Sequence, residues 1–284
     1  MKTLKHIVTA VTDFFIYANL LISIAAFAFT LQTALHFNYS YGAAAFFSLT
    51  NFVSTFVLYN LQRLYQSTKT NASERLNWYK NKRRLLFTFM FVFIALYYLV
   101  FKVNFSVYSN GILLYIPVGI LSLFYFLPPF ALRRLPFFKI FLIGLVWVCS
   151  SVIIPLLYKD LAFSYTHFSW NEYAYILAQF LFISAICIPF DIRDAENDKQ
   201  LGIKTLVVTQ GLSQAKSIGV VLLLAYMSLA QNSIQLLVYM LTGLPALALM
   251  LYSATHRHRY YYAVLVDGLI ILQFVLSLVF LRSR

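Results

Sequence analysis

The chain has 284 residues, of which 61% are hydrophobic, 18% aromatic and only 11% charged. Soluble domains carry about 25% charged residues and disordered chains have low hydrophobicity, so this composition argues against both classes. The 22 basic and nine acidic residues give a net charge of +13, but a nucleic-acid binder would need a polar face that most of the chain lacks. Composition therefore predicts a polytopic membrane protein.

Nine continuous apolar segments approach or reach the roughly 20 residues that a helix needs to cross a bilayer. The strands of a membrane β-barrel would instead alternate apolar and polar residues over about ten positions, so we predict an all-α bundle of about nine transmembrane helices. The seventh segment is the shortest, and it could pair with the eighth as a hairpin. The predicted spans are 13–35, 42–62, 85–103, 111–128, 138–157, 172–190, 214–230, 234–252 and 262–281.

The basic residues indicate how the helices are oriented, because Lys and Arg collect in cytoplasmic loops. If the N-terminus lies inside, 18 of the 22 basic residues fall in inner segments. These bases would face anionic lipid headgroups or an anionic substrate, so the charge requires no nucleic-acid partner. We predict an integral multi-pass protein with its N-terminus and basic loops in the cytoplasm, by default in a bacterial plasma membrane. Without a tandem repeat or linker, residues 1–284 form a single membrane-embedded domain.

Four of the nine acids lie within eight residues, just after Pro189 at the inner end of the sixth span. Asp191, Asp194 and Asp198 stand at positions i, i+3 and i+7, which share one face of a helix. Three converging carboxylates repel one another unless a cation lies among them, and Mg²⁺ binds one or two carboxylates together with phosphates and water. Spacing alone leaves a solvated acidic turn as an equal alternative.

The residues that follow the acids favour a metal site. Gly202 permits a backbone turn, and Lys204 brings a positive point charge that binds phosphate close to the carboxylates. An acid cluster, a turn and a base are together suited to holding a metal-bridged diphosphate.

The stretch from Asp191 to Leu206 resembles the second aspartate-rich motif of the UbiA family of intramembrane prenyltransferases. That motif reads Asp-x-x-Asp-x-x-x-Asp followed by Gly-Ile-Lys/Arg-Thr, and every element is present. A weaker similarity, from Leu132 through Lys139 to Gly144, resembles the basic loop before the family's fifth helix. The resemblance implies nine transmembrane helices, with aspartate motifs on cytoplasmic loops after the second and sixth.

The family's first motif, Asn-Asp-x-x-Asp-x-x-x-Asp, is degenerate in this chain. Asn60 matches its Asn, but the expected acids fall on Leu61, Leu64 and Thr68. Arg63 occupies this helix end, and we hypothesise that it contacts a diphosphate directly, replacing a metal-mediated link with a bidentate charge-assisted one. Alternatively, Arg63 anchors the helix at the lipid headgroups.

The resemblance implies Mg²⁺-dependent transfer of a prenyl group from a prenyl diphosphate to an aromatic (quinone-precursor) or lipid acceptor within the membrane. It assigns Asp191, Asp194 and Asp198 as the catalytic, metal-binding residues. The candidate diphosphate-binding residues are Lys204, Arg133, Arg63 and Asn60.

Two alternatives remain from the sequence. The chain could be a catalytically degenerate member that binds or assembles, because its first motif lacks acids. It could also be a transporter or lipid-binding protein that uses the intramembrane acids Asp13 and Asp267. For both acids we favour a structural role.

Overall fold

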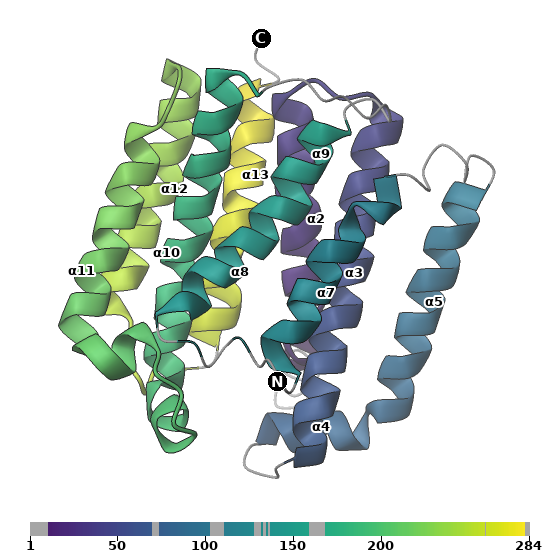
Figure 1. Ribbon diagram of the computed structural model, residues 1–284, viewed down its shortest axis with the longest axis vertical. Helices are drawn as coiled ribbons and strands as arrows, with labels where there is room; N and C mark the ends of the chain where they lie inside the picture. The colour runs from purple at the N-terminus through teal and green to yellow at the C-terminus, as the bar shows by residue number, and fades with distance from the viewer. Residues whose placement is uncertain are drawn as a thin grey trace, which may run out of the picture.

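The computed structural model describes residues 11–69, 74–102, 111–127, 132, 135, 137–158, 168–258 and 260–281. Within these ranges every regular element is a helix, and most helices stand side by side along the long axis of the molecule (Figure 1). The α-helices are α2 (Leu20–His36), α3 (Tyr41–Lys69), α4 (Glu74–Asn81), α5 (Arg83–Phe101), α7 (Tyr115–Phe126), α8 (Phe138–Val148), α9 (Ile154–Leu157), α10 (Trp170–Gln200), α11 (Leu206–Ser228), α12 (Ser233–Tyr252) and α13 (Asp267–Leu281), and the π-helical segments are Cys149–Ile153 and Tyr261–Val266.

The predicted all-α membrane bundle is confirmed. Seven helices are long and apolar enough to cross a membrane, and the bent pair Val11–Tyr17 and Leu20–His36 makes an eighth if it counts as one span. The segment Gly111–Phe126 is apolar but shorter, so each of the nine predicted spans falls on a helix of the described residues. The helix α11 that holds the seventh span begins at Leu206, but its backbone is not helical at Gly211, where φ is 84°, and the predicted span lies after this kink.

Helix α10 is the most deeply packed of these spans. In its most apolar stretch 67% of the residues are buried, compared with 17% in α5, which stands at the edge of the bundle in Figure 1. Its neighbours include α8 and α11, and the largest apolar cluster gathers around it. This cluster includes Phe29, Trp147, Phe182, Tyr226 and Tyr239.

The acid cluster lies on the last turns of α10 and is helical, as its spacing predicts. The helix begins at a capping box in which Ser169 and Glu172 each accept a hydrogen bond from the other's backbone N–H. It continues through Pro189 to Gln200 and is followed by Gly202, whose φ of 68° lies in the left-handed region that favours glycine. The carboxylates are therefore fixed to the central helix of the bundle.

The first span is broken at Asn19, where the two helical segments meet at 62°. Asn19 has a φ of 57°, a left-handed conformation that asparagine tolerates better than most residues. Its buried amide donates to Tyr79 Oη at 2.8 Å and to Asn60 Oδ1 at 3.2 Å, while its Oδ1 accepts from Arg75 Nη2 at 3.0 Å. This network ties α3 and α4 to the break before α2.

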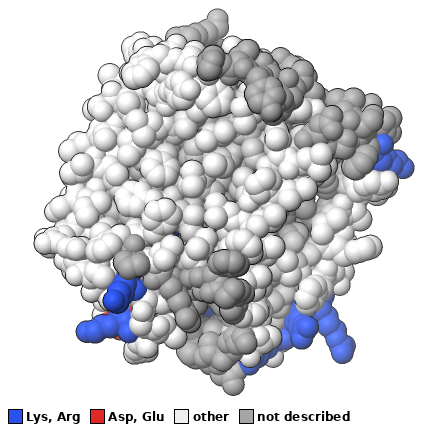
Figure 2. Space-filling view, in the orientation of Figure 1, with Lys and Arg blue, Asp and Glu red and all other residues white. Residues whose placement is uncertain are grey.

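Basic side chains gather at the ends of the bundle rather than around its middle. Figure 2 shows them at the end where α4 and the α10–α11 turn lie, and a small basic patch lies beside the opposite end of α5, where Lys102 follows the helix. The surface between is almost free of charge in this view, as expected for helices that face hydrocarbon.

The close approach of α8 to α10 depends on Gly144. A Cβ at this position would lie 2.4 Å from Ser184 Oγ, whereas a Cβ at Gly268 in α13 would meet nothing within 4 Å. We expect Gly144→Leu to destabilise the protein by about 1–3 kcal/mol because it overpacks this contact. Thermal unfolding in detergent measures the loss, with Gly268→Leu as the matched control. Equal effects of the two substitutions would contradict the role given to Gly144.

Candidate functional site

A cavity of about 290 Å³ opens between α2, α3, α4, α7, α8, α10, α13 and the π-helical segment that leads into α13. Its wall combines charged, polar and apolar side chains. The charged lining residues are Arg63, Arg75, Lys139, Asp191, Arg193, Asp194 and Asp267.

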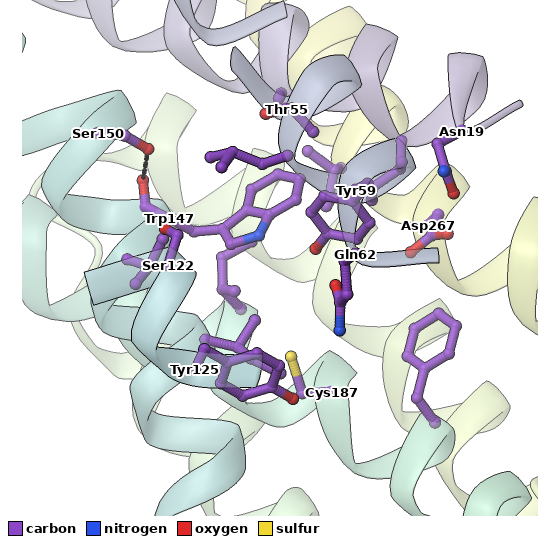
Figure 3. A pocket seen from close by; sticks show the side chains of 18 of the residues that line it. Asn19, Thr55, Tyr59, Gln62, Ser122, Tyr125, Trp147, Ser150, Cys187 and Asp267 are labelled. Carbon is purple, nitrogen blue, oxygen red and sulfur yellow. Dashed lines mark hydrogen bonds between the residues drawn. The ribbon is translucent and has the colours of Figure 1, made fainter. Parts of the chain in front are cut away.

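The middle of the cavity is apolar and aromatic. Figure 3 shows the Trp147 indole in the centre, Tyr59 and Gln62 of α3 opposite it, and Asp267 and Asn19 beyond them. A cavity that joins charged groups to an apolar chamber suits a ligand with an ionic head and an apolar body. The apolar lining residues include Leu58, Leu142, Ile143, Val146, Ile183 and Ile186.

Lys139, in the first turn of α8, joins two carboxylates of α10. Its Nζ lies 2.8 Å from Asp191 Oδ1 and 3.0 Å from Asp198 Oδ2. Both aspartates are buried, with 2% and 6% of their surface exposed, and Asp191 Oδ2 has no hydrogen-bond partner among the described residues. One ammonium group serves both carboxylates because positions 191 and 198 are two helical turns apart on one face.

Asp194 is held by its neighbour instead. Arg193 donates to it from Nε at 2.7 Å and from Nη2 at 2.9 Å, a bidentate charge-assisted pair. The guanidinium also lies over the rings of Phe190 and Tyr262, at 5.1 and 5.4 Å from their centroids. Aromatic stacking and ion pairing together fix the position of Arg193 at the cavity wall.

The structure brings together two of the three carboxylates that the sequence predicts to converge. Asp191 and Asp198 meet at Lys139, whereas Asp194 pairs with Arg193. In the part of the chain that the structure describes, no group of three or more His, Cys, Asp or Glu side chains is arranged to hold a metal ion. The cation that offsets carboxylate repulsion in this arrangement is a lysine of the protein itself.

The predicted diphosphate-binding bases are only partly found at the cavity. Arg63 lines it, but the Lys204 side chain is exposed and is not part of the wall. Lys204 contributes a backbone contact, because its carbonyl accepts from Phe137 N at 3.3 Å. Arg133 lies outside the described residues. The lysine beside the carboxylates is thus Lys139, which the sequence indicated only as part of a basic loop.

The predicted assignment of Asn60 to the diphosphate is not supported by its placement. Asn60 is fully buried and donates to Ala18 O at 3.0 Å and Phe56 O at 2.7 Å, so its amide joins helices. Leu64 of the same helix packs in an apolar cluster with Tyr79. The α3 residues that face the cavity are Asn51, Ser54, Thr55, Leu58, Tyr59, Gln62 and Arg63.

The rotation of α3 therefore differs from the one that the sequence match implied. None of Leu61, Leu64 and Thr68, where the first motif would place its acids, lines the cavity. These positions lie away from the cavity, because Asn60 and Leu64 make buried contacts on a different face of α3.

Two further charged residues complete the wall. Arg75 of α4 lines the cavity, although it was not predicted as a site residue. The one signal for it in the sequence is that a basic residue stands shortly after the end of α3. Asp267 lines the cavity at the start of α13. The sequence favoured a structural role for Asp267, and the structure shows that this residue also lines the cavity.

A second polar region of the wall forms around the π-helical segment Cys149–Ile153. The Ser150 carbonyl accepts from Asn51 Nδ2 at 2.9 Å and from Tyr115 Oη at 3.1 Å. The Asn51 amide also donates to Thr30 Oγ1 at 2.8 Å. The wider π-helical turn presents this carbonyl to side chains, so α3 and α7 are hydrogen-bonded to the α8 span inside the apolar zone, and α2 is joined to them through Asn51.

No known protein-family profile matches the chain, and no curated protein matches its sequence. Among solved structures, a UbiA homolog from Archaeoglobus fulgidus bound to DMAPP and Mg²⁺ is similar with a TM-score of 0.60 at 15% identity, over 96% of this chain and 100% of that one. The same homolog bound to GPP and Mg²⁺ gives 0.60 at 15% identity, over 95% and 99% of the two chains.

A structure of digeranylgeranylglyceryl phosphate synthase is also similar, with a TM-score of 0.52 at 14% identity over 96% of this chain and 97% of that one. These likenesses extend over nearly the whole of each chain. They show that this chain has the fold of the UbiA homologs.

Removing Lys139 should expose the dependence of the carboxylate pair on it. We expect Lys139→Met to destabilise the protein by about 3–5 kcal/mol, because it leaves two buried carboxylates without a cation. The double variant Lys139→Met/Asp198→Asn should recover part of that loss. Thermal unfolding in detergent measures both, and Lys216→Met, at a partly exposed lysine that donates to the Leu251 carbonyl and has no ion pair among the described residues, is the control. If Lys139→Met unfolds no earlier than the control, the bridge does not stabilise the fold.

Proposed function

We propose that this protein is an intramembrane prenyltransferase that moves a prenyl group from a prenyl diphosphate to an aromatic, quinone-precursor or lipid acceptor. The observation that carries the proposal is a single cavity that joins a cluster of cations and carboxylates to an apolar, aromatic interior. The UbiA homolog with the same fold was solved with DMAPP or GPP and Mg²⁺, and such ligands match both parts of this cavity.

The residues at the end of α10 fit a Mg²⁺ ion in part. Asp191 and Asp198 already share one cation, and Asp191 Oδ2 is a buried acceptor with no partner among the described residues. Carboxylate oxygens are the ligands that Mg²⁺ prefers, so these two would hold it, and Asp194 would join them by exchanging its Arg193 partner. A bound Mg²⁺ would stabilise the negative charge that develops on the leaving diphosphate.

The bases around this site would hold the diphosphate. Arg63 lines the cavity, and Lys139 would turn from the carboxylates towards the phosphate oxygens when a metal takes its place. Lys204, exposed beyond the end of α10, and Arg133 stay candidates for contacts at the cytoplasmic surface. Arg63 and Lys139 therefore carry the proposal more directly than Lys204.

The apolar chamber would hold the prenyl chain and direct the reaction. As the bond between the prenyl carbon and the diphosphate oxygen breaks, positive charge develops on the prenyl group. The ring faces of Tyr59, Tyr125 and Trp147 line the chamber and would stabilise that charge. Their apolar neighbours exclude water, so the prenyl cation would be attacked by the acceptor and not hydrolysed.

A specific observation favours a second candidate, a member that binds prenyl diphosphate without transferring the prenyl group. The positions of the first motif's acids hold no carboxylate and do not line the cavity. A role in transport based on Asp13 has less support, because Asp13 accepts from Tyr260 Oη at 2.8 Å and so ties two helical segments together.

The protein is an integral membrane protein with several spanning helices. We propose that the end of the bundle with α4 and the α10–α11 turn faces the cytoplasm, since most of the basic residues gather there. Prenyl diphosphate would then enter from the cytoplasmic side of a bacterial plasma membrane, and the acceptor from the lipid.

The assignment of the carboxylates can be tested with labelled GPP, Mg²⁺ and a panel of aromatic and lipid acceptors. We expect Asp191→Asn and Asp198→Asn each to lower prenyl transfer by about 100-fold or more, because each removes a charged ligand from the diphosphate site. Glu196→Gln is the control, since the Glu196 side chain on the same helix end is 66% exposed and lies 3.5 Å from exposed His256.

Three outcomes separate the candidates. Transfer that falls only in the aspartate variants supports the enzyme and its site. Mg²⁺-dependent binding of GPP without any product from the wild type supports the binding member. Neither binding nor product would reject both.

A further inference from the structure

Two partly buried arginines, Arg63 and Arg75, line the cavity without a carboxylate partner among the described residues. The other two cations of the wall are paired, Lys139 with Asp191 and Asp198, and Arg193 with Asp194. Neither Arg63 nor Arg75 has an ion pair among the described residues. Their charges are therefore the ones available to a ligand.

The hydrogen bonds of Arg63 leave most of its donors for a ligand. Its Nη1 donates to Gln66 Oε1 at 3.0 Å, and its buried Nε has no partner in the described part of the chain. A guanidinium has five N–H donors, and burying one without an acceptor is unfavourable. A ligand with several negatively charged oxygens would satisfy these donors.

Arg75 reaches the same cavity from a different element. Its Nη2 donates to Asn19 Oδ1 at 3.0 Å, and its guanidinium lies 5.7 Å from the Tyr17 ring centroid. Its buried Nε has no hydrogen-bond partner among the residues that the structure describes. The network of Asn19 with Tyr79 and Asn60 fixes this arrangement, so Arg75 is positioned before any ligand binds.

Both guanidinium groups lie at the wall of the same cavity. Two like charges in a poorly solvated site repel each other, and an anion between them turns this repulsion into attraction. Asp267 on the facing wall is the remaining acid, and one carboxylate does not offset two arginines.

We infer that Arg63 and Arg75 form a metal-independent anion site for the diphosphate, in place of the carboxylates and metal that an intact first motif would supply. Planar guanidinium groups bind phosphate oxygens in bidentate fashion and need no bridging ion. The inference rests on the proposed function and makes it more specific: the diphosphate is held by arginines on the α3–α4 side and by a metal only on the α10 side.

Binding of inorganic diphosphate and of DMAPP to the purified full-length protein, measured by calorimetry in EDTA and in Mg²⁺, tests this inference. We expect the wild type to bind both probes in EDTA and more tightly in Mg²⁺. Arg63→Gln and Arg75→Gln should each weaken binding in EDTA by about 10- to 100-fold, the range for losing hydrogen bonds to a charged group. Arg63→Lys should also weaken it, since a point charge lacks the guanidinium's fork of donors.

Two controls separate the arginine side from the metal side. Arg84→Gln, at an exposed arginine of α5, should leave binding unchanged under both conditions. Asp198→Asn should remove the gain from Mg²⁺ and retain binding in EDTA.

The outcomes distinguish this inference from the proposed function. Wild-type binding that occurs only with Mg²⁺ would overturn the arginine site and leave the prenyltransferase proposal standing. Arginine variants that fold and bind as the wild type does in EDTA would overturn it as well. Absence of binding under both conditions would reject the inference together with the proposed function.

Discussion

The need to offset buried charge governs the architecture of this protein. Four cations and four carboxylates lie at or beside the wall of one cavity in a bundle that is otherwise built from apolar helices. A charge inside a membrane protein is costly unless it faces a partner or a ligand. Lys139 meets this requirement for Asp191 and Asp198, and it thereby fixes the start of α8 against the end of α10.

Much of this arrangement can be predicted from the sequence, because hydropathy and spacing are local signals. Continuous apolar runs gave the spans, and the separation of Asp191 and Asp198 correctly placed them on one face of a helix. The lysine that lies beside these acids at the end of α10 was predicted less well. The sequence favoured Lys204, which is near the acids along the chain, whereas Lys139 is near them in space because α8 packs on α10.

The rotation of α3 could not be predicted from a motif match. Matching Asn60 to the family pattern aligned the motif along the α3 sequence. The face of α3 that turns towards the cavity depends instead on contacts between α3 and other helices. Asn60 is held by Ala18 and Asn19, so Tyr59, Gln62 and Arg63 face the cavity instead. Arg75 was missed for a similar reason, since the network that directs it depends on a break in the first span that hydropathy does not reveal.

The π-helical segment Cys149–Ile153 has a consequence for how this chain can vary. It fits one extra residue into the α8 span, and the Ser150 carbonyl it presents is bound by Asn51 and Tyr115. Deleting one residue there would turn the wide turn into a regular α-helical one and leave the segments on its two sides close to their present orientation. The Ser150 carbonyl would then return to the regular helical hydrogen-bond ladder, and Asn51 and Tyr115 would lose their shared acceptor. The extra residue is therefore tied to these hydrogen bonds between helices and not to the register of the span.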